Sequence, residues 1–146
     1  MTADTTVSTI AHLIQLSVAP VFLLTGVGSI LGVLAARLGR IVDRSRVLET
    51  NMPNIAQEAQ AVAHLELSRL SIRAGLINWA ISLCTICALL ICTLIALLFV
   101  GDFVTADMAN FVALLFIVAM LTLIGGLLCF LREIYMAIKN LRIGLH

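Results

Sequence analysis

Two cysteines three residues apart, Cys84 and Cys87, form the first pattern in the sequence that could do chemistry. A C-x-x-C pair can hold a metal, but structural zinc needs four ligands, and the apolar stretch around this pair contains no His, Asp or Glu. Residues three apart on one helix also fail the geometry of a disulfide. We therefore interpret the thiols as small packing residues and predict no metal and no cofactor.

His12, with Gln15 one helical turn away, is the next candidate. It could be a ligand, a proton carrier or an interfacial side chain, and ionisable groups inside a membrane are functional hypotheses by default. No Cys, Asp or Glu lies beside it in the sequence, which favours the interfacial interpretation. The sequence also contains no recognisable Ser/His/Asp arrangement, phosphate loop or carboxylate pair, so we predict that the protein is not an enzyme.

The third candidate is a charged group, Arg37, Arg40, Asp43 and Arg44, that directly follows a long apolar run. These residues can be topology determinants and anchors for anionic lipid, with Asp43 pairing to the residues three before and three after it. Alternatively, if several copies surround an axis, the arginines form a basic ring at the mouth of an anion pore. The sequence favours the first interpretation, because basic residues are expected at this place in any membrane protein, and leaves the second open.

Composition defines the elements that must position these residues. The chain has 146 residues, of which 62% are hydrophobic and only 12% charged, and its mean hydropathy is +1.14. Residues 5–36, 74–101 and 108–131 contain no Asp, Glu, Lys or Arg. Each run exceeds the roughly 20 residues that cross a bilayer as a helix. The sequence thus predicts an all-α integral membrane protein with three transmembrane helices.

The charge distribution predicts how these helices are oriented. All nine basic residues lie either between the first two runs or after the third. Because short loops rich in Lys and Arg remain in the cytoplasm, we expect the N-terminus outside and the C-terminus inside a plasma membrane. The first run lacks the basic start and the short apolar core of a signal peptide, so we expect it to be a retained span.

We predict a single membrane domain over residues 1–146, with spans at about residues 15–37, 74–100 and 107–131. A long cytoplasmic helical hairpin at about 38–73 extends the first two spans, and a cytoplasmic helix at 132–146 follows the third. Pro20 should kink the first helix. Asn51 and Pro53 should end it, and Asn54 should cap the second helix, with Gln57 as its capping-box partner.

The first helix carries a stripe of mostly small or polar residues, spaced alternately by four and three. Its members are Ser8, His12, Gln15, Ala19, Phe22, Gly26, Ser29, Val33, Ala36, Arg40 and Asp43. Gly28 and Gly32 lie beside it, spaced as G-x-x-x-G, a pattern that lets helices approach closely in lipid. Three spans offer too little surface to cover such a stripe, so we expect a homo-oligomer.

Three stretches together resemble a family of small bacterial three-helix inner-membrane proteins that is classed as a domain of unknown function. They are APVFLLTGVGSILGVLAARLGRIVDRSRVLE, NWAISL and LIGGLLCFLREIYMAI, and the likeness covers most of the chain. The resemblance implies a three-helix protein of the bacterial inner membrane. It implies no activity, cofactor or catalytic residue.

Two functions from different classes are compatible with these features. The first is a passive pore or ion channel, lined by the first helix and entered through a basic cytoplasmic mouth. The alternative is a non-conducting scaffold or accessory subunit of a membrane complex, whose cytoplasmic hairpin binds a partner. The partners expected in either case are the lipid bilayer, further copies of the chain, and anions or anionic lipid headgroups, but no nucleic acid.

Overall fold

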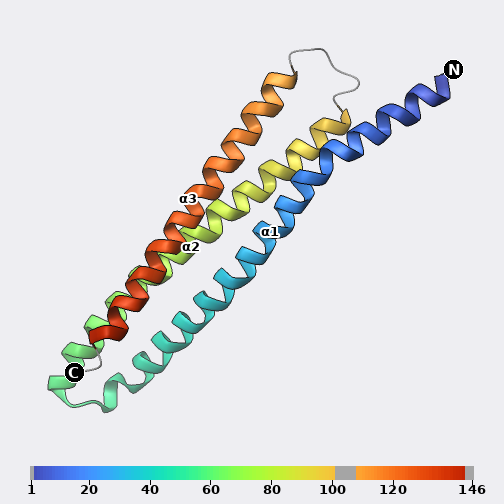
Figure 1. Ribbon diagram of the computed structural model, residues 1–146. Helices are drawn as coiled ribbons and strands as arrows, with labels where there is room; N and C mark the ends of the chain where they lie inside the picture. The colour runs from blue at the N-terminus through green and yellow to red at the C-terminus, as the bar shows by residue number, and fades with distance from the viewer. Residues whose placement is uncertain (1, 101–107, 144–146) are drawn as a thin grey trace. The chain divides into compact units, whose positions relative to one another are not determined.

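The computed structural model describes residues 2–100 and 108–143, with the side chains of residues 4–100 and 109–139. Helix α1 covers Thr2–Asn51, α2 covers Gln57–Val100 and α3 covers Met108–Ile143 (Figure 1). Each is long and apolar enough to cross a membrane, and the described residues contain no strand. The all-α prediction is therefore confirmed, and the chain has the build of a multi-pass membrane protein. Residues 101–107, where the sequence predicts the connection between the second and third spans, and the last three residues lie outside the described residues.

The turn between α1 and α2 follows the sequence prediction only in part. Helix α1 ends at Asn51, as predicted, and a short 3-10 turn, η1, covers Met52–Asn54. The predicted cap at Asn54 is wrong, because Ile55 is extended and α2 begins at Gln57, where the Ala56 carbonyl accepts the first helical hydrogen bonds. Pro53 fixes the backbone of the turn and leaves Asn54 inside it.

Pro20 lies inside α1 without ending the helix. It is buried, and having no N–H it cannot donate the helical hydrogen bond that the carbonyl of Leu16 would otherwise accept. Figure 1 shows α1 bending within its blue, N-terminal part, the part in which the sequence predicts the kink. A missing hydrogen bond and a crowded preceding turn are the physical reasons for such a bend.

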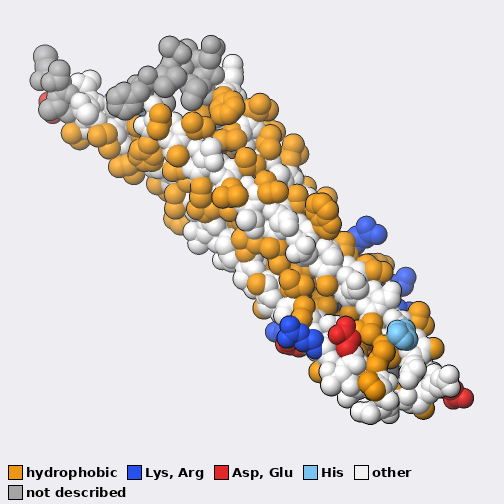
Figure 2. Space-filling model, turned by 180° about the vertical axis from the view of Figure 1, so that it is seen from behind, with side chains coloured by type: hydrophobic (Ala, Val, Ile, Leu, Met, Phe, Trp, Pro, Cys, Tyr) orange, Lys and Arg blue, Asp and Glu red, His pale blue; other side chains and the backbone are white. Residues whose placement is uncertain are grey.

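Contacts within the chain define two compact units. The first combines Met1–Ile30 with Cys84–Ile124, and the second combines Leu31–Leu83 with Gly125–His146. All the described Arg, Lys and Glu residues belong to the second unit, whereas the described part of the first carries a single charged residue, Asp4. On the face drawn in Figure 2, the blue side chains therefore belong to the second unit and stand among hydrophobic ones.

Buried residues recur every seven positions along each helix, which is the repeat of left-handed helix packing. The members of these repeats are Val27, Leu34 and Ile41 in α1, Ala63, Leu70, Ile77, Cys84 and Ile91 in α2, and Ala119, Gly126 and Glu133 in α3. Cys84 and Cys87 are both fully buried, in agreement with their interpretation as packing residues. The α3 repeat has two small members and ends on a carboxylate, which places Glu133 in the core of the second unit.

Candidate functional site

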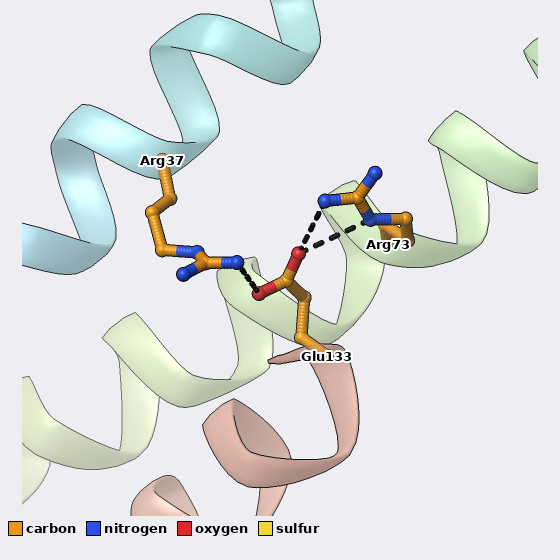
Figure 3. A network of polar contacts seen from close by, with 3 residues as sticks. All are labelled: Arg37, Arg73 and Glu133. Carbon is orange, nitrogen blue, oxygen red and sulfur yellow. Dashed lines mark hydrogen bonds and ion pairs between the residues drawn. The ribbon is translucent and has the colours of Figure 1, made fainter. Parts of the chain in front are cut away.

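Glu133 is fully buried, although its side chain is a carboxylate. Arg73 of α2 donates two hydrogen bonds to Oε1 of Glu133, from Nε at 3.1 Å and from Nη2 at 2.8 Å. Arg37 of α1 forms an ion pair with the other oxygen, Oε2, from Nη2 at 3.0 Å. Figure 3 shows the two guanidinium groups approaching the carboxylate from their separate helices. We call these three residues the Glu133 cluster.

Each member of the Glu133 cluster lies at or next to the end of one of the three uncharged runs of the sequence. Arg37 directly follows the uncharged run 5–36, Arg73 directly precedes the run 74–101, and Glu133 is the second residue after the run 108–131. Glu133 is fully buried while Arg37 and Arg73 keep part of their side chains exposed, so the ion pairs reach from the inside of the bundle to its surface. The cluster thus joins the helices at the ends of their apolar segments.

The two oxygens of Glu133 differ in how they are held. Oε1 accepts the hydrogen bonds from Arg73, whereas Oε2 accepts none within the described residues, because the contact with Arg37 is close but not aligned as a hydrogen bond. The Arg37 guanidinium also lies over the Phe130 ring, with its carbon 5.5 Å from the ring centroid, within the range of a cation–π contact. Arg73 is therefore the firmer partner and Arg37 the more adaptable one.

The charges of the Glu133 cluster do not cancel. Two guanidinium groups and one carboxylate leave one formal positive charge, and the side chains of Arg37 and Arg73 remain 31% and 20% exposed. Burying a carboxylate costs several kcal/mol unless cations and hydrogen bonds compensate it, which explains why two arginines converge here. The arrangement can fix the register of three helices, and its spare N–H groups can bind an anion at the edge of the apolar segments.

A second ion pair joins α1 to α2 farther along the same unit. Arg44 donates hydrogen bonds from Nε at 3.1 Å and from Nη2 at 3.0 Å to one oxygen of Glu66. Both side chains are well exposed, 57% and 40%. An ion pair in such surroundings contributes at most about 1 kcal/mol.

The residues predicted to form a pore lining or an interface all lie on the surface. In the first unit these are His12, Gln15, Gly26, Gly28 and Ser29, and in the second Gly32 and Ala36. Every member of the predicted stripe is exposed, from Ser8 to Asp43, and a Cβ added at Gly26, Gly28 or Gly32 would meet no atom within 4 Å. We call this stripe the α1 face. The described part of the chain leaves it uncovered.

The four charges predicted to act together lie in different surroundings. Arg37 belongs to the Glu133 cluster and Arg44 to the pair with Glu66, while Arg40 is exposed and has no ion pair within the described residues. The predicted pairing of Asp43 with Arg40 and Arg46 is not present: none of these three residues takes part in an ion pair that the described residues contain. Exposed pairs within one helix gain too little to fix long side chains.

Glu133 and Arg73 were not among the residues predicted from the sequence, although both positions carry a signal. Glu133 continues the seven-residue repeat of Ala119 and Gly126, so it falls at a core position of α3. Arg73 is the last charge before its apolar run, as Arg37 is the first charge after its own. Among the described residues no group of three His, Cys, Asp or Glu side chains could hold a metal ion.

Comparison with known proteins gives one match. The family described as Protein of unknown function (DUF2721) matches residues 17–143, a range that contains α2 and every member of the Glu133 cluster. No curated protein and no solved structure matches the chain.

Proposed function

This chain belongs to the DUF2721 family of proteins of unknown function, and we propose that it is a non-enzymatic membrane protein that assembles with copies of itself as a scaffold or accessory subunit. The observation that carries the proposal is the α1 face, which the rest of the described chain leaves uncovered. Its small residues permit close contact between helices, and its polar ones are costly against lipid. Another copy of the same chain is a protein that is always available in the membrane to cover this face.

The ion pairs favour a scaffold over an anion pore. A basic mouth needs arginines whose charge is free to attract anions. Of Arg37, Arg40 and Arg44, two are engaged by carboxylates of the same chain. The charge of Arg44 is offset by Glu66, and Arg37 shares Glu133 with Arg73, so the three arginines attract anions less than three free ones would. The Arg44–Glu66 pair joins α1 directly to α2, and Glu133 of α3 links the two helices through Arg37 and Arg73, which gives a partner a defined surface to bind.

A pore remains the second candidate because of the polar residues on the α1 face. His12, Gln15 and Ser29 are all exposed. The hydroxyl of Ser29 donates a hydrogen bond to the carbonyl oxygen of Thr25 at 3.1 Å. If α1 helices surround an axis, these groups line a path for water. In that arrangement Arg40 would be the basic group at the inner mouth, and anions or anionic headgroups its ligands.

The proposed location is the bacterial inner membrane, with the N-terminus outside and the charged hairpin in the cytoplasm. The support is the one-sided distribution of Arg and Lys. Membrane-impermeant thiol reagent on intact cells should label a cysteine introduced at Thr105 and spare one introduced at Gln57. Labelling at residue 57 alone would reverse the orientation.

Self-assembly is tested by measuring the mass of the purified protein in detergent, with a bulky residue added on either of two surfaces. Gly32→Leu places the bulk on the side of α1 that we propose to be an interface, and Ala96→Leu places it at an exposed position of α2. We expect the first variant to dissociate the oligomer and the second to leave it intact. A monomeric wild-type protein would refute the proposal.

Ion flux into liposomes separates the scaffold from the pore. The scaffold predicts no flux above empty liposomes for wild-type protein that is folded and oligomeric. A pore predicts an anion flux that Arg40→Glu shifts toward cations, whereas Arg132→Glu, an exposed change on α3, has little effect. Because salt shortens the Debye length from about 10 Å at 0.1 M to about 3 Å at 1 M, the anion preference of a pore should weaken at high salt.

A further inference from the structure

Helix α2 carries a second uncovered surface, within the second unit. Its members are Val62, Leu65, Arg69, Ile72, Leu76 and Trp79, and we call them the α2 seam. They are spaced alternately by three and four residues, the spacing by which one helix packs along another. Val62, Leu65 and Trp79 are 65%, 62% and 66% exposed. The seam therefore has the spacing of a helix-packing surface but has no packing partner among the described residues.

The position of the α2 seam makes lipid an insufficient cover. Val62, Leu65 and Ile72 precede the uncharged run that begins at residue 74, so most of the seam lies beyond the apolar segment of α2. Large apolar side chains gathered on a surface outside the hydrocarbon mark an interaction site. A partner packed on the seam would cover Arg69, so a negative charge on that partner at the same level would favour the contact.

The ion pairs define the levels of α1 and α2 relative to each other. Arg37 and Arg73 both contact Glu133, and Arg44 contacts Glu66. Going seven residues forward along α1 therefore corresponds to going seven residues back along α2. The two helices run antiparallel, with residue 41 at the level of residue 69. Asp43 is two residues from that level, which is about 3 Å along the axis. Asp43 and Arg69 are both exposed, and neither has an ion pair within the described residues.

Copies of a membrane protein share one orientation in the bilayer. Residues that lie at the same height in one chain therefore also lie at the same height in neighbouring copies. Pairing two α2 seams would therefore set Arg69 against Arg69. Pairing the seam with the α1 face of the next copy instead sets Arg69 between Arg40 and Asp43, so this contact offers Arg69 an opposite charge that a contact between two seams lacks. The same register puts Trp79 opposite residue 31, beside the open surface of Gly32.

We infer that the α2 seam of one copy packs on the α1 face of the next, with Arg69 forming an ion pair with Asp43 of that neighbour. The inference rests on the proposed self-assembly and specifies its contact. Each copy offers one surface and receives the other, so the contact can repeat around any closed cyclic assembly, from a twofold dimer upward.

Disulfide trapping between two differently marked copies tests the contact. Cys92 and Cys129 are first replaced by Ala, because they are not fully buried, while Cys84 and Cys87 remain in the core. One tagged copy carries Asp43→Cys and the other Arg69→Cys, so that any bond between residues 43 and 69 joins two chains. The matched control combines Arg46→Cys with Arg69→Cys, because Arg46 is exposed on α1 outside the α1 face.

We expect the Asp43/Arg69 combination to cross-link at least about tenfold faster than the control, because the contact raises the local thiol concentration. Charge reversal gives a second measurement. Arg69→Asp should weaken assembly on the order of 10-fold to 100-fold, and adding Asp43→Arg should restore it.

The mass of the unmodified protein in detergent separates the two possible failures. A monomer would refute self-assembly and this contact with it. An oligomer that cross-links no faster than the control, or that links Arg69→Cys copies to each other instead, would overturn this contact and leave self-assembly standing.

Discussion

The Glu133 cluster and the Arg44–Glu66 pair use the same side chains in opposite surroundings. Both are arginine–glutamate contacts of about 3 Å, but Glu133 is fully buried while Glu66 and Arg44 are well exposed. Water solvates the exposed pair almost as well when it is broken. The buried carboxylate has no such alternative, so its arginines determine whether α3 can pack against α1 and α2 at all. Similar distances therefore correspond to very different energies.

Removal of the buried carboxylate should have the largest effect. Glu133→Ala leaves Arg37 and Arg73 facing each other without a counter-charge, and we expect a loss on the order of 3 kcal/mol of unfolding free energy. Glu66→Ala is the matched control in the exposed pair and should cost less than about 1 kcal/mol. Denaturant titration in detergent, followed by the fluorescence of Trp79, measures both. Equal losses would show that burial does not distinguish the two sites.

The two arginines of the Glu133 cluster should differ from each other. Arg73→Ala removes two hydrogen bonds to the carboxylate, whereas Arg37→Ala removes one ion pair of a more exposed side chain. We expect a loss of about 2 kcal/mol for Arg73→Ala, within the range for hydrogen bonds to charged groups, and about half of that for Arg37→Ala. The same titration tests the order, and a larger loss for Arg37→Ala would contradict the assignment of Arg73 as the firmer partner.

The exposed pair should respond to salt and the buried cluster should not. Arg44→Ala should cost less than about 1 kcal/mol at low ionic strength, and this difference from wild type should shrink as salt is raised toward 1 M. The loss caused by Glu133→Ala should stay nearly constant over the same range. A strong salt dependence of the Glu133→Ala loss would mean that solvent reaches the cluster.

The smallest predicted effect concerns two glycines, one at a packed position and one at an open position, and involves no charge. A Cβ at Gly125 would lie 3.3 Å from Cδ1 of Leu83, so that side chain must shift, whereas a Cβ at Gly39 would meet no atom within 4 Å. Alanine gains up to about 1 kcal/mol of helix propensity over glycine. Gly39→Ala should therefore be the more stable of the two variants in thermal unfolding, and the reverse order would mean that the Leu83 side chain moves without cost.

Much of the fold could be predicted because apolar runs and helix breakers are local signals. The uncharged runs predicted the helices, and Asn51 with Pro53 predicted the end of α1. The start of α2 was predicted too early, since the cap rule considers residues one at a time whereas Pro53 and Ile55 act together in the turn.

The Glu133 cluster was harder to predict because it is a contact between residues far apart in sequence. A single helix shows which of its faces is apolar, but it does not show which charges from two other helices will face it. The seven-residue repeat through Ala119 and Gly126 indicates burial of Glu133, yet the identity of its partners depends on the register of three helices. The α1 face could be proposed from the sequence because it depends on the spacing of residues within one helix and not on contacts between helices.

The place of Glu133 in chain order has a consequence for synthesis. A ribosome delivers Arg37 first, then Arg73, and the carboxylate that both of them need only after a further 60 residues. Until α3 is inserted, Arg37 and Arg73 lack the carboxylate that both of them contact in the complete fold. Completion of the bundle is thus coupled to the arrival of its last span, because Arg37 and Arg73 repel each other until Glu133 lies between them.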